Sequence, residues 1–206
     1  MSSFVGHSLA GLATYAITQR MQASPSPRQT HLSWRWATWL LVVASLPDVD
    51  YLVPALILEQ ANQRIRTTHS LLFALLIPGC TVLVLWLLGK RGTPHKWQSV
   101  QVVGVGLSHL VLDLLTGVFP LPVLYPFSTQ TFRLPFGLLP SAGRIQFTNY
   151  FLYRNLLIEL GVLLSLILSL LALTKRAVGL GKRLLLVLAG FTTSIGFMVW
   201  VASLSR

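Results

Sequence analysis

The sequence predicts an all-α, polytopic membrane protein, a bundle of about four to six transmembrane helices with one long proline-rich loop. Of its 206 residues, 53% are hydrophobic and only 10% are charged, whereas a soluble domain carries about 25% charged residues. The apolar residues also gather in segments close to the roughly 20 residues that cross a bilayer. We therefore expect residues 1–206 to form a single membrane-embedded domain.

Six segments are predicted to be helical, over residues 3–20, 34–50, 68–88, 99–119, 155–174 and 184–204. The second is interrupted at Leu46-Pro47-Asp48-Val49-Asp50, because proline removes a backbone donor. Ser24-Pro25-Ser26-Pro27 predicts a linker between the first two segments. A loop of about 33 residues, with five prolines, follows the fourth segment, and loops of that length are usually functional or disordered.

The net charge of +11 is spread in short clusters between the apolar segments. This pattern argues against nucleic-acid binding, which needs a continuous basic patch, and is typical of membrane topology. Six crossings place both termini on one side, and the more basic loops then predict the cytoplasmic side of a plasma or inner membrane. The cytoplasmic set is Arg20, Arg28, Arg35, Lys90, Arg91, Lys96, Lys175, Arg176, Lys182 and Arg183, against Arg64, Arg66, Arg133, Arg144, Arg154 and Arg206.

Acidic residues are rare, and four of the five lie in apolar sequence, where charged groups are costly and usually functional. The predicted topology places them and three histidines at similar depth, near the non-cytoplasmic face. The candidate metal ligands are His7, Asp48, Asp50, His69, His109 and Asp113. Glu159 lies at the same depth, and either a proton relay or a pair with Arg154 would explain it.

The local spacings suit coordination of a metal. His109 and Asp113 are separated by four residues and share one helix face, while Asp48 and Asp50 occupy a turn broken by proline. Imidazole with carboxylate favours zinc, with manganese or iron as alternatives. Supporting hydrogen bonds are expected from Ser70, Ser108 or Thr116.

Each motif alone has a structural alternative. His7 could be a buried hydrogen-bonding residue, the Asp-x-Asp segment a turn that ends a helix, and the His-x-x-x-Asp segment a structural pair. Their common depth favours the metal site. Cys80 is interpreted as a packing residue because it lies alone in an apolar run, and His31 and His95 as solvated loop residues.

Four blocks resemble the YdjM-like family of membrane-bound metal-dependent hydrolases. These are Gly6-His7, Leu46-Pro47-Asp48-Val49-Asp50, Thr68-His69-Ser70, and Leu107-Ser108-His109 with Asp113 and Thr116. The prolines after the last block are similar too, at Leu124-Tyr125-Pro126-Phe127 and Phe132-Arg133-Leu134-Pro135. The motif-bearing part is thus residues 1–140, and the helices over 154–204 are generic. The chain departs from the family at Arg64-Ile65, where His-Arg is common.

The resemblance implies a metal-dependent hydrolase, distantly similar to zinc-dependent phospholipase C and P1 nuclease, and hence phosphoester cleavage. We expect a lipid or lipid-linked substrate, with Asp48 or Asp50 available as general base. Arg66, Arg133 or Arg144 would bind phosphate, since guanidinium matches it bidentately. A metal-ion transporter and an inactive membrane protein with a structural metal are the alternatives, although inverted repeats typical of transporters are absent from the sequence.

Overall fold

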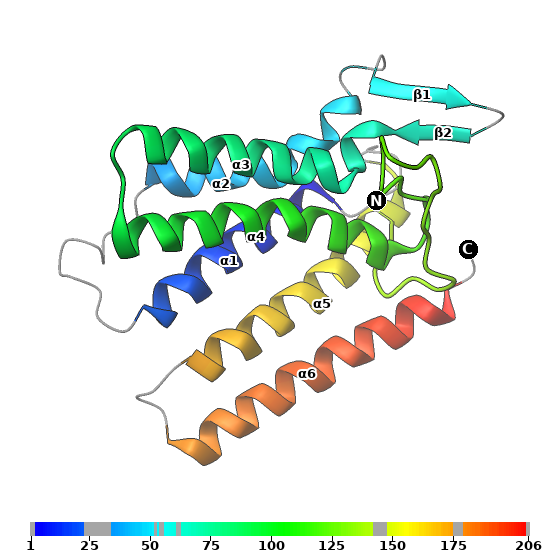
Figure 1. Cartoon of the computed structure of the whole chain (residues 1–206). Coiled ribbons are helices and arrows are strands. Elements are labelled where there is room, and N and C mark those ends of the chain that lie inside the picture. The colour runs from blue at the N-terminus through cyan, green and yellow to red at the C-terminus, as the bar shows by residue number, and fades with distance from the viewer. Residues whose placement is uncertain are drawn as a thin grey trace.

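The computed structural model describes residues 3–22, 34–51, 53, 56–60, 63–141, 148–174 and 179–204. The all-α prediction is confirmed, because helices dominate these residues (Figure 1). The helices are α1 (Phe4–Met21), α2 (Trp34–Ser45), α3 (Leu71–Leu87), α4 (Gly92–Thr116), α5 (Tyr150–Thr174) and α6 (Leu180–Ser203). Two short 3-10 helices, η2 (Leu46–Tyr51) and η4 (Thr67–His69), flank a hairpin of β1 (Ile57–Gln60) and β2 (Gln63–Arg66).

Local sequence signals begin two helices and end a third, each close to a candidate ligand. The Ser3 side chain caps α1 by accepting from the Gly6 amide at 3.0 Å, and Ser70 caps α3 by accepting from Phe73 at 3.2 Å. Gly117 ends α4 in the left-handed region, at φ +58°, where glycine has no Cβ penalty. These boundaries fix the ends of α1 and α4 that carry His7 and Asp113, and the start of α3 directly after His69.

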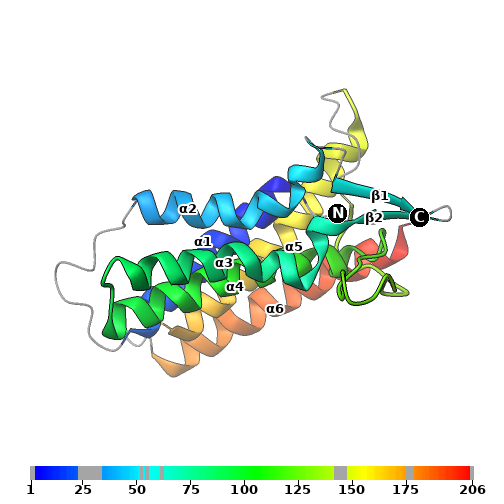
Figure 2. The same cartoon turned by 45° about the horizontal axis from the view of Figure 1, so that its top comes forward.

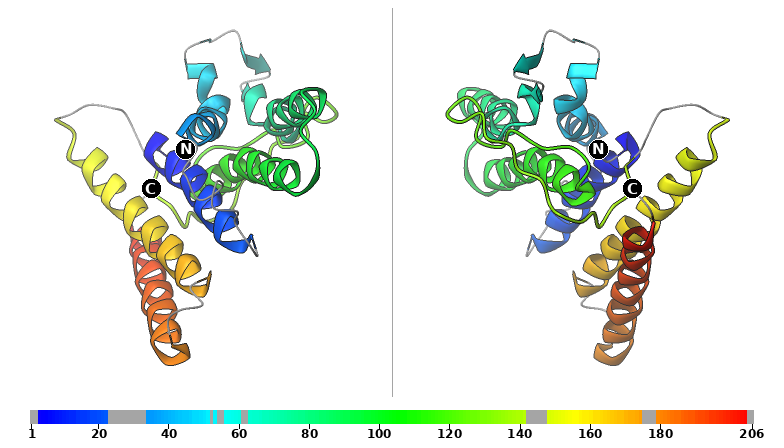
Figure 3. Two further views of the ribbon diagram at one scale, coloured as in Figure 1. Left: turned by 90° about the vertical axis from the view of Figure 1, so that its left-hand side faces the viewer. Right: turned by 90° about the vertical axis from the view of Figure 1, so that its right-hand side faces the viewer.

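Helix α1 lies between two groups of helices. It contacts α2 and α4 on one side and α5 on the other, while α3 packs on α4 and α5 on α6, as the view along the bundle shows (Figure 3). Tyr15, Leu40, Val43, Ala44, Val102 and Val105 form one buried apolar cluster, and Leu112, Leu139, Val162 and Leu163 form a second. These two clusters hold α1, α2, α4 and α5 in register.

Within the described residues, three helices are long and apolar enough to cross a membrane: α4, α5 and α6. Helix α3 is also apolar but has only 17 residues. Large hydrophobic side chains remain exposed on α3, α5 and α6, for example Leu83, Leu168 and Leu188. Lipid is the natural environment for such side chains.

All of the candidate ligands lie at one end of the bundle. Helix α1 begins, α2 ends, α3 begins and α4 ends there, and the hairpin and the loop over residues 117–141 gather beside them (Figures 1 and 2). Basic residues of α1, α4 and α6 lie toward the opposite end, for example Arg20, Lys96 and Lys182. The predicted linker Ser24-Pro25-Ser26-Pro27, together with Arg28, His31, Arg144, Lys175, Arg176 and Arg206, lies outside the described residues.

The structure differs from expectation in four places. The hairpin, in which Ile57 pairs with Arg66, was not predicted. Cys80 is exposed on α3 rather than packed, and His95 lies half-buried in the first turn of α4 rather than in a solvated loop. Helix α4 begins at Gly92, earlier than expected, and its polar first residues, including Thr93 and Lys96, are exposed.

Candidate metal centre

The structure brings His7, Asp48, Asp50, His69, His109 and Asp113 together in one buried cluster. They come from α1, η2, η4 and α4, and Asp48, at 4% exposure, is the most accessible. Pro47 lies in the 3-10 turn that follows α2, and this turn places the two aspartates on the inner side of the bundle.

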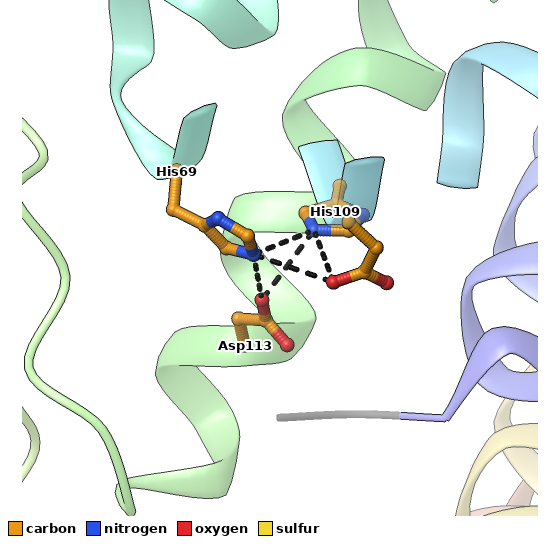
Figure 4. Close-up of side chains that lie close together, drawn as sticks. His69, His109 and Asp113 are labelled. Atoms are coloured by element: carbon orange, nitrogen blue, oxygen red, sulfur yellow. Dashed lines mark hydrogen bonds and ion pairs between the residues drawn. The ribbon is translucent and has the colours of Figure 1, made fainter. Parts of the chain in front are cut away.

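Four of these residues form a compact group of ligand atoms. In Asp48, His69, His109 and Asp113, one ligand atom of each lies within 4.8 Å of the other three. Asp113 Oδ2 lies 3.2 Å from His69 Nε2 and 3.4 Å from His109 Nε2 (Figure 4). Asp48 Oδ1 lies 3.5 Å and 4.0 Å from the same two nitrogens. Four ligands at 2.0–2.2 Å from a tetrahedral ion would be about 3.3–3.6 Å apart, so the spacing suits one ion.

Hydrogen bonds to neighbouring groups fix the proton on two of the imidazoles, His109 and His69. His109 Nδ1 lies 2.7 Å from the carbonyl oxygen of Ala44, which only accepts, so Nδ1 carries the proton. Thr68 donates its single hydroxyl proton to Asp50 at 3.1 Å and therefore accepts from His69 Nδ1 at 3.0 Å.

Both Nε2 atoms consequently turn lone pairs toward one another, at 3.4 Å, and toward two carboxylates. A buried group of four acceptors is costly without a cation between them. The donor set therefore fits a divalent metal, with two imidazoles and two carboxylates as zinc or manganese prefers.

Asp50 has a different role from Asp48. Both of its oxygens accept from Arg66, one from Nε at 2.5 Å and the other from Nη2, and Thr68 donates to it as well. The guanidinium also lies over the Tyr51 ring, 4.4 Å from its centroid. Burial lowers the pKa of Arg66, but Asp50 outweighs burial and the pKa is raised. Arg66 thus remains a cation at the edge of the cluster, with Nη2 3.8 Å from Asp48.

His7 stacks on His109, with ring centroids 3.8 Å apart. Its helix is held at the start by Glu159 of α5, whose Oε1 accepts from the Ser3 amide at 2.9 Å. Arg154 donates to the Asn155 side chain and lies over the Phe151 ring. Glu159 therefore positions the first turn of α1.

The remaining candidates lie away from the ligand atoms. Arg133 is exposed, and within the described residues no hydrogen bond or ion pair joins it to the cluster. The Ser70, Ser108 and Thr116 hydroxyls bond to backbone atoms of Phe73, Val105 and Asp113.

The supporting bonds come instead from Thr68 and the Ala44 carbonyl. Thr68 is next to His69 in the sequence, so its role as a hydrogen-bond partner of that histidine could have been predicted. No sequence pattern marks a backbone carbonyl.

Ile65 and Gly106 lie close in sequence to Arg66 and His109. Ile65 is buried, at 2% exposure. It is the second residue of Arg64-Ile65, where His-Arg is common in the family. At Gly106 an added Cβ would lie 2.7 Å from Pro78 Cγ and would also meet the Ala74 carbonyl. Glycine therefore lets α3 and α4 approach closely, one turn before His109.

The fold and the cluster define a helical membrane protein with a buried acid–histidine group able to hold a metal ion. The family model of the YdjM inner membrane protein matches residues 1–200. The chain therefore belongs to the YdjM inner membrane protein family. The match extends past residues 1–140 and includes the last two helices, which sequence alone left generic. Comparisons with curated proteins and with solved structures found no match.

Proposed function

We propose that this protein is a membrane-embedded, metal-dependent hydrolase that cleaves a phosphoester of a lipid or lipid-linked substrate. The observation that carries the proposal is the group formed by Asp48, His69, His109 and Asp113. A divalent ion held there would supply Lewis-acid chemistry, which polarises a phosphoryl oxygen and, where a coordination position is open, lowers the pKa of a bound water toward about 7. Zinc is the preferred ion, with manganese or iron as alternatives.

Arg66 supports an anionic substrate. Asp50 holds its Nε and Nη2, whereas Nη1 makes no hydrogen bond to any described residue. At 14% exposure, the side chain lies between the buried cluster and the surface. A phosphate oxygen next to the ligands would therefore find a fixed cationic donor, and Asp50 would orient that donor without being a ligand itself.

The position of the cluster supports a lipid substrate. It lies at one end of a bundle whose sides are apolar, so a lipid could keep its tails in the bilayer while its head group enters the site. The loop at this end carries exposed aromatic side chains, including Phe127 at 88% exposure, Phe132 and Phe136. We propose that this end faces the non-cytoplasmic side.

The structure gives some support to a structural metal as the second candidate. Four protein ligands close a zinc site, whereas catalytic sites usually keep one position for water. Transport is less well supported, because the ligands gather at one end of the bundle rather than at the midplane where transporters bind ions.

The proposal is tested with purified protein in detergent, loaded with zinc or manganese and supplied with a panel of phospholipids and short-chain phosphoesters. We expect metal-dependent release of a phosphorylated product, abolished in His109→Ala and retained in His95→Ala. His95 is the matched control because it lies 14 residues earlier on the same helix, about 21 Å away. Full metal loading without turnover of any phosphoester would favour the structural alternative.

A further inference from the structure

His7 is a buried imidazole whose ring nitrogens have no hydrogen-bond partner among the described residues. Its side chain is fully buried, and neither Nδ1 nor Nε2 bonds to any described residue. Stacking on His109 accounts for its packing but leaves both polar atoms unsatisfied, which is costly in a protein interior. A functional partner for Nε2 would remove the part of that cost that falls on this atom.

Two of the three aspartates, Asp48 and Asp113, each turn one oxygen toward His7 and the other toward His69. Asp48 turns Oδ1 toward His69, at 3.5 Å, and Oδ2 toward His7 Nε2, at 3.9 Å. Asp113 turns Oδ2 toward His69, at 3.2 Å, and Oδ1 toward His7 Nε2, at 3.6 Å. The contacts of His7 are too long for hydrogen bonds. They match ligands of one ion, which at bonds of 2.0–2.2 Å lie about 3–4 Å apart.

We propose that His7 Nε2, Asp48 Oδ2 and Asp113 Oδ1 form a second divalent-cation site, so that both aspartates bridge two ions. This inference rests on the proposed function, because the first ion occupies the group of four ligands described above. Carboxylates that bridge in this way are compatible with the separation of about 3.5–4 Å found in two-metal hydrolytic sites.

The two sites would differ in accessibility to substrate. The first has four protein ligands, which is typical of a closed site, whereas the second has three and keeps a position for water or substrate. The second site would therefore be the one that contacts the reacting group.

Charge supports an anionic occupant of that open position. Two divalent ions with Asp48 and Asp113 leave a surplus of two positive charges, since Arg66 and Asp50 neutralise each other. A phosphoester would compensate that surplus, and a neutral ester or amide would not.

Metal stoichiometry tests the inference directly. Purified protein is stripped with a chelator and titrated with Mn²⁺, and bound metal is measured by elemental analysis after removal of free ions. We expect two ions per chain in the wild type, one in His7→Gln and two in His95→Gln. We also expect the electron paramagnetic resonance spectrum of the wild type to show spin coupling between two Mn²⁺ ions, and that of His7→Gln to show an isolated ion.

The outcomes separate this inference from the proposed function. A single, uncoupled ion in the folded wild type would overturn the second site and leave the hydrolase proposal in place. No ion at all in folded protein would overturn both. Should His7→Gln fail to fold, the wild-type stoichiometry and coupling still decide the question, because they need no variant.

Discussion

His109 Nδ1 lies 2.7 Å from the carbonyl oxygen of Ala44, at the point where α2 gives way to the 3-10 turn carrying Asp48. This bond joins α4 to α2 and fixes the tautomer that exposes the Nε2 lone pair. The end of α2 and the turn after it thus position two ligands. The Ala44 carbonyl orients His109, and the following 3-10 turn carries Asp48.

Metal content should depend on the four ligands. We expect the purified wild type to retain a transition metal, and His109→Ala or Asp113→Asn to lose most of it, because each removes one of four ligand atoms. Elemental analysis beside His95→Ala gives the comparison. Wild-type protein that is folded yet free of transition metal under every loading condition would contradict the metal centre.

Asp48 and Asp50 should behave differently despite their similarity in sequence. Asp48→Asn is expected to lose metal, whereas Asp50→Asn should still fill at saturating metal, because Arg66 and Thr68 bond to Asp50. Loss of a hydrogen-bonded neighbour costs about 10–100-fold in metal affinity, so Asp50→Asn should bind more weakly. Titration of each variant measures both quantities, and equal loss of metal from both would make Asp50 a ligand.

Metal removal should lower the thermal stability of the wild type. The ligands come from η2, η4 and α4, and an ion that binds only the folded state stabilises it by about 2.7 kcal/mol at a free concentration 100 times its Kd. Differential scanning fluorimetry with and without chelator measures the shift. His109→Ala serves as the control, and a shift of equal size in this variant would show that the chelator acts elsewhere.

Gly106→Ala should weaken the site without touching a ligand. The new Cβ would collide with Ala74 and Pro78 and push α3 from α4, and such overpacking typically costs about 1–3 kcal/mol. We expect a lower Tm and weaker metal binding than in Gly79→Ala, where no atom lies within 4 Å of the added Cβ. If the two variants had the same Tm and metal affinity, the close approach of α3 to α4 at Gly106 would not be needed for the site.

The orientation in the membrane is testable by cysteine labelling. In a Cys80→Ser background, Thr93→Cys should resist an impermeant reagent applied outside intact cells, and Gln130→Cys should react, because the basic end is predicted to be cytoplasmic. Both positions are exposed in the structure. The reverse pattern would place the metal centre on the cytoplasmic side.

Much of the site could be predicted because its residues conflict with their surroundings. Asp48, Asp113 and His109 interrupt apolar helices, and a common depth for them follows from counting crossings. The bidentate lock between Arg66 and Asp50 could not be predicted, because it depends on a hairpin of four-residue strands with no clear alternation.

The division of each carboxylate between two groups of imidazoles was also out of reach. It depends on side-chain angles, which no spacing in the sequence determines. The sequence predicts which residue types lie at a given depth. The orientation of each carboxylate and imidazole depends on tertiary packing.

The shortness of α2 has a mechanical consequence for the surrounding bilayer. Its 12 residues span about 18 Å at 1.5 Å per residue, against a hydrocarbon thickness of about 30 Å. The 3-10 helix η2 continues α2 but carries Asp48 and Asp50, and polar groups there cannot face acyl chains. If α2 lies in the bilayer, either protein covers this turn or the bilayer beside α2 is thinner. Thinning there would draw phospholipid head groups inward, toward the depth of Asp48.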